Sequence, residues 1–408
     1  MSIDAKMMAP KAYIVEGILL FVGILFLRGT FIAEMYFNAA LASIFIFSAI
    51  LINFKLNKVE SKLHFFIVGL LLVFIIGGII SIFKNPESST GIMKSVLTFL
   101  IPVFLFLLIP FTSKRIAIAF KLIILLDVIL IISYVLTLII FAFSSKLYFL
   151  FGINYDYYID AKVYFPFTIL YGGAYNAGSV FIPRLLGIYR EGGIAQIMFF
   201  YCFLQVDYLF NTKRKILKWV LLFGVLITFS TAGLATAIFM IGHLYLDKKD
   251  WKIRFSTGIY ISIFAVLLLL GALFAPHVGL IDKSSGASYD YRADAQDNAW
   301  SIIMDRPFLG SGYLNDVKNT PPTNLLASIY QFGIPLWSGL VIIYLSGVIS
   351  CNKRTLQKLV EFTPLVLTLF FSQPLYFQPL FILYMSWWIK SGDFGFAGPN
   401  STKRCIAL

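Results

Sequence analysis

Long runs of apolar residues alternate with short polar segments along the whole chain. Most runs approach the roughly 20 apolar residues that a transmembrane helix needs. Lipid offers no partner for backbone groups, so such runs are expected to fold as helices. The pattern predicts about twelve membrane helices, at residues 12–27, 31–54, 63–83, 92–111, 116–142, 194–211, 216–231, 232–247, 255–275, 323–350, 359–372 and 374–390. We expect an all-α, polytopic integral membrane protein with a single transmembrane domain over residues 1–408.

Two regions, residues 216–247 and 359–390, are each assigned two membrane helices but are short for two full crossings of the membrane. Residues 216–247 have basic residues at both ends, and the small and polar residues of TFSTAGLATA in the middle are typical of a bend. At about 1.5 Å per residue, such a hairpin has short or tilted helices. Residues 359–390 are interrupted by Pro364, Pro374 and Pro379, so we expect a break there too.

The composition supports a membrane protein. Hydrophobic residues make up 59% of the chain and charged residues only 13%, against roughly 25% in soluble domains. The net charge of +13 would suit a nucleic-acid partner, but the basic residues gather at the ends of the predicted helices, where they orient a membrane protein. Their distribution predicts that both termini are cytoplasmic. The first apolar run contains Glu16 and is followed by Arg28, which argues against a cleaved signal peptide.

The cysteines and histidines suggest neither disulfides nor a metal site. Cys202 falls within a predicted helix, and Cys351 and Cys405 fall on the predicted cytoplasmic side. No CxxC pair or histidine cluster occurs, so we expect no metal. We interpret His64 and His243 as interface or packing residues, and His277 is a weak candidate for an acid–base group.

Two long segments fall on the predicted outer side. The first, residues 143–193, is crowded with aromatic residues, and the second, residues 276–322, is polar. Loops of this length are usually functional or disordered, and the first is too apolar for disorder. The function should therefore lie where these two extracytoplasmic loops meet the membrane helices.

The stretch RLLGIYREGG, from Arg184 to Gly193, places three ionisable groups at the mouth of a predicted helix. Guanidinium groups are permanently charged and suit phosphate or diphosphate, and glycines allow a close approach of backbone to a ligand. Arg184, Arg190 and Glu191 are therefore candidate catalytic residues. The alternative is that the arginines extend to the membrane interface, or that an Arg–Glu pair closes the loop.

The second loop contains YDYRADAQDNAWSIIMDRPFLGSGY. Residues from Arg292 to Met304 predict a short helix that ends at Pro307, with Trp300 near one face. Such a helix could lie on the outer membrane surface, hold Arg292 toward the first loop and carry Arg306 at its end. The alternative is an interfacial helix with solvated charges.

A third motif, TPPTNLLASIYQFGI, begins a predicted membrane helix. Asn324 is a polar group at that helix start, and it could contact a substrate or serve as an N-cap. Within the predicted helices, charged residues such as Asp127 are functional candidates by default. They are scattered, however, and lack the paired pattern of an ion-coupled transporter.

The motifs RLLGIYREGG, FSTAGLA, YR…W…RPFLGSGY and TNLLASIYQFGI follow one another in this order. This series resembles the bacterial O-antigen polymerase and ligase superfamily, particularly the polymerases of Wzy type. The resemblance covers about residues 180–345, and the earlier helices agree only in hydropathy. Each motif alone is loose, whereas their order and spacing are more specific.

The resemblance implies glycosyl transfer at the outer face of the bacterial inner (cytoplasmic) membrane. An undecaprenyl-diphosphate-linked oligosaccharide would be polymerised by moving the growing chain to the non-reducing end of a new lipid-linked unit, with no cofactor, nucleotide sugar or metal. The family's functional arginines would correspond to Arg184, Arg190 and Arg292. Glu191 would be a candidate base on the acceptor hydroxyl. The substrate-binding candidates are Tyr189, Trp300, Arg306 and Asn324.

Other functions stay open at this point. Ligases of the superfamily usually carry a histidine where the second loop meets the next helix, and here that place reads Pro322-Thr323-Asn324. This difference favours a polymerase in O-antigen, capsule or exopolysaccharide synthesis over an O-antigen ligase. A lipid-linked oligosaccharide flippase or other transporter is the third alternative. Possible partners are the chain-length regulator and flippase of the same pathway.

Overall fold

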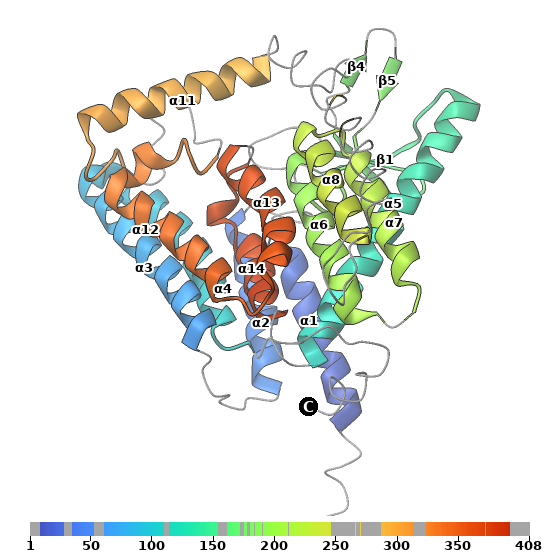
Figure 1. Cartoon of the computed structure of the whole chain (residues 1–408), viewed down its shortest axis with the longest axis horizontal. Coiled ribbons are helices and arrows are strands. Elements are labelled where there is room, and N and C mark those ends of the chain that lie inside the picture. Colours follow the sequence, from blue (N-terminus) through green and yellow to red (C-terminus); the bar gives the residue numbers. More distant parts are fainter. Residues whose placement is uncertain are drawn as a thin grey trace, which may run out of the picture.

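The protein is a bundle of helices with two small sheets at one end (Figure 1). The computed structural model describes residues 9–27, 35–52, 61–109, 114–153, 161–171, 175–177, 180–182, 184–189, 191–210, 212–245, 266, 270, 287–312, 324–371 and 373–391. The helices are α1 (Ala9–Phe26), α2 (Met35–Ile52), α3 (Ser61–Lys84), η1 (Pro86–Ser88), α4 (Ser89–Phe106), α5 (Lys114–Ser144), α6 (Gly192–Leu209), α7 (Arg214–Leu226), α8 (Thr231–Tyr245), α11 (Ala287–Asp305), α12 (Ile329–Ser350), α13 (Thr355–Phe371), η3 (Leu375–Phe377) and α14 (Pro379–Ser391).

Several of these helices suit a bilayer. Four are long and apolar enough to cross a membrane, at Leu63–Lys84, Pro86–Phe106, Ile116–Ser144 and Ile329–Ser350. Three shorter apolar helices lie at Tyr13–Phe26, Phe37–Ile52 and Thr231–Tyr245. This agrees with a polytopic membrane protein, while the number of twelve crossings stays a prediction. The expected helix at 255–275 lies outside the described residues except for positions 266 and 270.

The expectation of an all-α fold is wrong for the first outer loop. Strands β1 (Phe149–Ile153), β2 (Ala161–Tyr164) and β3 (Thr168–Tyr171) form a three-stranded antiparallel sheet. Strands β4 (Tyr175–Ala177) and β5 (Val180–Ile182) form a separate antiparallel pair. Aromatic and β-branched residues favour strands, and the loop is rich in both. The aromatic residues that excluded disorder therefore also favoured local sheet structure.

Both expected breaks are present. Helix α7 ends at Leu226 and α8 begins at Thr231, and between them Phe229 has a positive φ of 47°. The bend therefore falls inside TFSTAGLATA. The run at 359–390 divides into α13 and α14, with the short η3 turn and Pro374 between them.

Helix α6 lies at the centre of the bundle. All residues from Ile194 to Asp207 are buried, and the helix contacts α5, α7, α8, α13 and α14. A helix that is apolar all round is stable only where other elements cover it. The outer helices instead expose apolar side chains, such as Phe65 and Leu72 of α3, on faces that suit lipid.

The strands and α11 mark one end of the bundle, which the charge distribution predicts to be extracytoplasmic. We call this the outer end, and the opposite end, where α6 finishes and α13 starts, the inner end. Figure 1 shows α11 lying across α3 and α12 instead of running along the bundle. The outer end thus combines strands, a transverse helix and the beginning of α6.

Candidate functional site

The segment before α6 is fixed between a strand and a turn. The N–H group of Leu185 donates to the carbonyl of Ile227 in the α7–α8 turn (3.3 Å), and that of Leu186 donates to Ile169 of β3 (3.1 Å). Gly187 adopts a φ of +61°, in the left-handed region that favours glycine. These contacts place Arg184, whose side chain is half-buried, beside the α7–α8 turn at the outer end.

Tyr189 faces the interior of the bundle. Its side chain is fully buried, and its hydroxyl donates to Oδ2 of Asp127 on α5 (3.0 Å). The thiol of Cys202 on α6 donates to the same oxygen (3.2 Å). Tyr189 therefore anchors the loop inward, next in sequence to Arg190, which lies outside the described residues.

Glu191 is the N-cap residue of α6. Its backbone is extended, and its carbonyl accepts hydrogen bonds from the N–H groups of Ile194 (3.0 Å) and Ala195 (2.8 Å). Its half-buried side chain makes no capping hydrogen bond. The first N–H groups of any helix, here those of Gly192 and Gly193, have no partner within the helix. Together with the helix dipole they make this terminus attractive to negative charge.

The two glycines after Glu191 allow two other segments to approach the start of α6. A Cβ atom on Gly192 would lie 3.0 Å from the carbonyl oxygen of Thr228, in the α7–α8 turn. A Cβ atom on Gly193 would lie 2.6 Å from Nε2 of Gln373, which follows α13. Because Leu185 and Gly192 contact consecutive residues of the α7–α8 turn, the Arg184 segment and the start of α6 are neighbours.

Buried polar side chains join three helices beneath this start. Nε2 of Gln196 donates to the carbonyl of Gly193 (3.1 Å) and to Oγ1 of Thr368 on α13 (3.1 Å). The hydroxyl of Thr236 on α8 donates to Oε1 of Gln196 (2.8 Å). Gln196 thereby uses its amide nitrogen and oxygen to fix α6, α8 and α13 relative to one another.

Asn324 lies near the same end of α13. The N–H group of the next residue, Leu325, donates to the carbonyl of Leu369 (2.9 Å). Oδ1 of Asn324 accepts the N–H group of Ala327 (2.8 Å) in the turn that leads into α12. Asn324 thus caps the turn of residues 325–328, whereas the N-cap residue of α12 itself is Ser328, and a substrate contact stays a prediction.

Trp300 and Arg306 lie apart from this group. Both are exposed, Trp300 to 51%, whereas Ala299 on the other face of α11 packs against Ala327 and Tyr330. Helix α11 spans the expected residues 292–304 and extends beyond them at both ends. The side chain of Arg292 lies outside the described residues.

The C-terminal end of α11 is tied to α3. The ammonium group of Lys84 donates to the carbonyl of Gly310, just beyond this helix end. The opposite end of α11, where Arg292 lies, points toward the side of β4 and β5 in Figure 1. Whether the side chain of Arg292 faces the first loop stays a prediction.

The segment after α11 interlocks with a kink in α12. Gly310 and Gly333 both have positive φ, +57° and +71°. A Cβ atom on Gly310 would lie 2.4 Å from the carbonyl oxygen of Tyr330, and one on Gly333 would lie 2.4 Å from that of Phe308. The N–H group of Ile334 also donates to Pro307 (2.8 Å). We call this contact of residues 307–312 with residues 330–334 the clasp.

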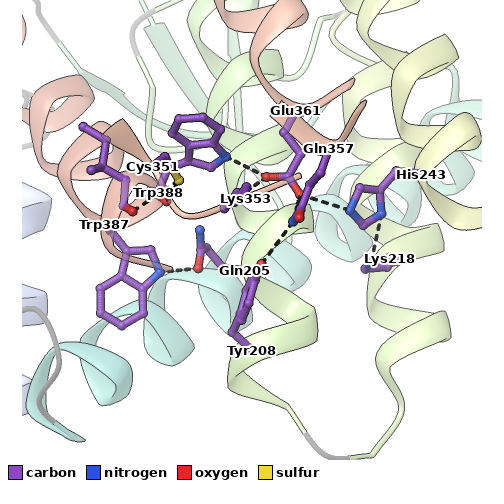
Figure 2. A network of polar contacts seen from close by, with 11 residues as sticks. Gln205, Tyr208, Lys218, His243, Cys351, Lys353, Gln357, Glu361, Trp387 and Trp388 are labelled. Atoms are coloured by element: carbon purple, nitrogen blue, oxygen red, sulfur yellow. Dashed lines mark hydrogen bonds and ion pairs between the residues drawn. The ribbon is translucent and has the colours of Figure 1, made fainter. Parts of the chain in front are cut away.

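The inner end contains a buried polar network that the sequence did not reveal (Figure 2). Glu361 of α13 is at its centre. One carboxylate oxygen accepts hydrogen bonds from Nζ of Lys353 (2.6 Å) and Nε1 of Trp388 (2.8 Å). The other oxygen accepts a hydrogen bond from Nε2 of Gln357 (2.9 Å). The carboxylate is thus shared among donors from the α12–α13 connection, α13 and α14.

A second ion pair completes the inner network. Lys218 of α7 donates to Asp207 of α6, and its Nζ atom lies 3.4 Å from Nδ1 of His243 on α8. An ammonium group can only donate, so Nδ1 is the acceptor and the imidazole proton sits on Nε2. That nitrogen lies 3.6 Å from Oε1 of Glu361. His243 therefore links the two ion pairs and is more than a packing residue.

The start of α6 thus combines fixed donors with the carboxylate of Glu191. A guanidinium group and helix N–H groups can stabilise negative charge on a leaving group, and a carboxylate can accept a proton from a hydroxyl group. Among the described residues, no three His, Cys, Asp or Glu side chains gather closely enough to hold a metal ion. The structure brings Arg184, Glu191 and Asn324 to one end, and Trp300 and Arg306 are exposed on α11 and just after it.

Comparisons with known proteins agree with the resemblance seen in the sequence. Residues 216–339 match the family model Wzy_C, described as O-Antigen ligase. The chain is also 25% identical over 255 residues to an O-antigen ligase from Salmonella typhimurium, a match that covers 56% of this chain and 60% of that relative. No solved structure matches the chain. The region from α7 to the first half of α12 is thus similar to the O-antigen ligase family, within the wider ligase and polymerase superfamily.

Proposed function

We propose that the chain is a membrane glycosyltransferase that takes a glycan from a polyprenyl-diphosphate carrier at the outer end of the bundle. The observation that carries this proposal is the convergence of Arg184, Glu191 and the first turn of α6 at that end. A departing diphosphate gains negative charge, which fixed donors stabilise. The match of residues 216–339 to the Wzy_C family supports the same class of reaction.

Each candidate residue has a role in this proposal. Arg184 and Arg190 bind the diphosphate of the donor, with Arg292 approaching from α11. Glu191 accepts the proton of the attacking hydroxyl group. Tyr189, held by Asp127, positions the loop that carries them. The carrier is undecaprenyl diphosphate, and the membrane is the inner membrane of a bacterium.

The first candidate for the acceptor is a second lipid-linked glycan or lipid core, as in an O-antigen ligase. Both comparisons favour this choice, since the family model and the relative from Salmonella typhimurium bear that description. Because the match covers 60% of that relative, its activity as a whole protein is carried over only as a proposal.

The second candidate is the polymerase reaction. Here the acceptor is the non-reducing end of a new lipid-linked unit. The observation in its favour is that no histidine occurs from residue 278 to the end of the chain, which includes the start of α12, where the ligases usually carry one.

The structure argues against a transporter. A flippase that alternates between two openings must separate the inner ends of its helices. Here those ends are joined by two buried ion pairs, Lys218–Asp207 and Lys353–Glu361, and by His243 between them. An inward opening would have to separate these contacts between α6, α7, α8 and α13.

Replacing Arg184 with Ala tests the site. We expect glycan transfer to fall by roughly 10²–10³-fold, as is typical when one group that stabilises a developing anion is lost. Arg354→Ala, at the exposed inner end, is the matched control and should retain transfer. Normal transfer by correctly inserted Arg184→Ala protein would contradict the proposed site.

Deleting the gene in its native host separates the acceptors. Lipid-linked polymer that accumulates without reaching its final acceptor would indicate a ligase. Loss of long chains, with single repeat units still reaching the surface, would indicate a polymerase. Repeat units trapped on the cytoplasmic side would instead indicate a transporter and would overturn the proposed function.

A further inference from the structure

Gln373 is a buried amide with an unused side chain. The residue is only 5% exposed, and its backbone is bonded on both sides, to Thr368 and Leu375 (2.8 Å each). No hydrogen bond joins its side chain to another residue in the described part of the chain, and its amide atoms are not among the fully enclosed polar atoms that lack a partner, so they keep some contact with solvent. Gln196, one turn into α6, is also buried and uses both ends of its amide. Gln196 thus has hydrogen-bond partners for its amide in this region, whereas the Gln373 side chain has none among the described residues.

The amide of Gln373 points at the beginning of α6. Its Nε2 atom lies 2.6 Å from the position that a Cβ atom on Gly193 would occupy. Gly192 and Gly193 are only half-buried, so part of this helix start is exposed. The amide therefore adds two N–H donors at a helix terminus that already presents its own unpaired N–H groups.

The break between α13 and α14 creates this arrangement. An intact helix through residues 372–378 would bond its backbone internally and carry position 373 around the helix axis. Instead Pro374 and η3 end the helix, and Gln373 turns against α6. The sequence pattern FFSQPLYFQP therefore combines a membrane break with glutamine.

We propose that Gln373 and the first N–H groups of α6 bind a phosphate group of the lipid-linked donor. This inference rests on the proposed function and deepens it by assigning a further substrate-binding residue. The site is rich in donors, which suits phosphate oxygens because these only accept hydrogen bonds. Glu191 opposes an anion here, and the positive charge of Arg184 and Arg190 in the same segment offsets it.

The experiment compares wild-type protein with Gln373→Leu in detergent, using sugar-free undecaprenyl diphosphate as the probe. Leu has a similar size and no donors. We expect the variant to bind the probe at least about ten-fold more weakly, as loss of hydrogen bonds to a charged group predicts. Its unfolding temperature should change little, because the Gln373 amide makes no hydrogen bond to the described residues and Leu fills a similar volume.

Gln357→Leu is the matched control. That amide is also buried, but it donates to Glu361 at the inner end. Its loss should lower the unfolding temperature and leave binding of undecaprenyl diphosphate unchanged. Loss of a glutamine that binds the ligand should therefore weaken binding of the probe alone, whereas loss of a structural glutamine should lower the unfolding temperature alone.

Several outcomes would overturn the inference. Equal binding of the probe by wild type and Gln373→Leu would do so, as would a fall in unfolding temperature like that of the control. Weaker binding of a phosphate-free oligosaccharide alone would assign Gln373 to sugar instead. If the wild-type protein itself does not bind undecaprenyl diphosphate, the proposed function fails too, which is a separate result.

Discussion

The two ends of the bundle treat buried polar groups differently. At the inner end, Glu361 accepts three hydrogen bonds, and Lys218 is paired with Asp207. At the outer end, Gln196 is satisfied, but the amide of Gln373 has no partner among the described residues. A paired network holds helices together, whereas an open donor at an accessible helix start remains available to a ligand.

This contrast distinguishes polar side chains that hold the helices together from those that are available to bind a ligand. Charge alone is a poor guide, because the charged side chains of the inner network, such as Lys218, Lys353 and Glu361, bind one another within the bundle. The side chain that points to a ligand is an uncharged amide. Stability and activity should therefore respond separately to substitutions at the two ends.

The largest effect that we predict is on stability at the inner end. Glu361→Ala removes the acceptor of Lys353, Gln357 and Trp388 and leaves a buried ammonium group without its partner. The free energy of unfolding should fall by about 3–5 kcal/mol. Denaturant unfolding in detergent measures it.

The control for this change is Glu87→Ala, at an exposed position in η1. It should alter the free energy of unfolding by less than about 0.5 kcal/mol. Transfer per folded molecule should be normal in both variants. A Glu361→Ala protein that is fully stable but inactive would contradict the structural role of the inner network.

The second effect is on activity at the outer end. Gly193→Ala places a methyl group 2.6 Å from Nε2 of Gln373, which is too close for a normal contact, so the amide must move away. Because the displaced atom ends a flexible side chain, stability should change by less than about 1 kcal/mol. Glycan transfer per folded molecule should fall by about ten-fold, as when a hydrogen bond to a charged group is lost.

Two comparisons sharpen this prediction. Gly192→Ala brings its methyl group to 3.0 Å from the backbone carbonyl of Thr228, which cannot swing aside, so this variant should lose stability. In a Gln373→Leu protein, Gly193→Ala should cause no further loss of transfer, since the amide is already absent. Additive losses in the double variant would show that Gly193 acts without Gln373.

The smallest effect concerns Asn324. Asn324→Ala removes the oxygen that accepts the N–H group of Ala327, and about 1 kcal/mol of stability should be lost. Asn324→Asp keeps an acceptor and should be nearly neutral. Thermal unfolding and glycan transfer together decide the role. Normal stability with poor transfer in Asn324→Asp would favour the substrate contact over the cap.

Much of the fold could be predicted from the sequence. Hydropathy located the described apolar helices, with the largest difference at α12, which begins at Ile329 instead of 323. TFSTAGLATA and Pro374 marked the two breaks correctly, whereas Pro364 lies inside α13 and does not interrupt it. Hydropathy alone works well because lipid forces backbone groups to pair within a helix. The strands at 149–182 could not be placed from the sequence, because a loop rich in aromatic residues excludes disorder without fixing which strands pair.

The site was harder to predict, because it depends on contacts between distant segments. Lys218 and Lys353 were interpreted as charges that orient the chain, and nothing local shows that they meet Asp207 and Glu361. Gln373 is uncharged, so the rule that marks ionisable groups within membrane helices does not identify it. Its position next to a proline break within an apolar run is the one signal that could have identified it.

The clasp has a consequence for how the sequence can change over evolutionary time. Gly310 and Gly333 each leave no room for a side chain, because the backbone of the other segment fills the space. No second substitution can restore that space, since nothing smaller than glycine exists. A lineage can therefore keep both glycines or rebuild the whole junction between α11 and α12, but it cannot pass from one to the other through single tolerated replacements.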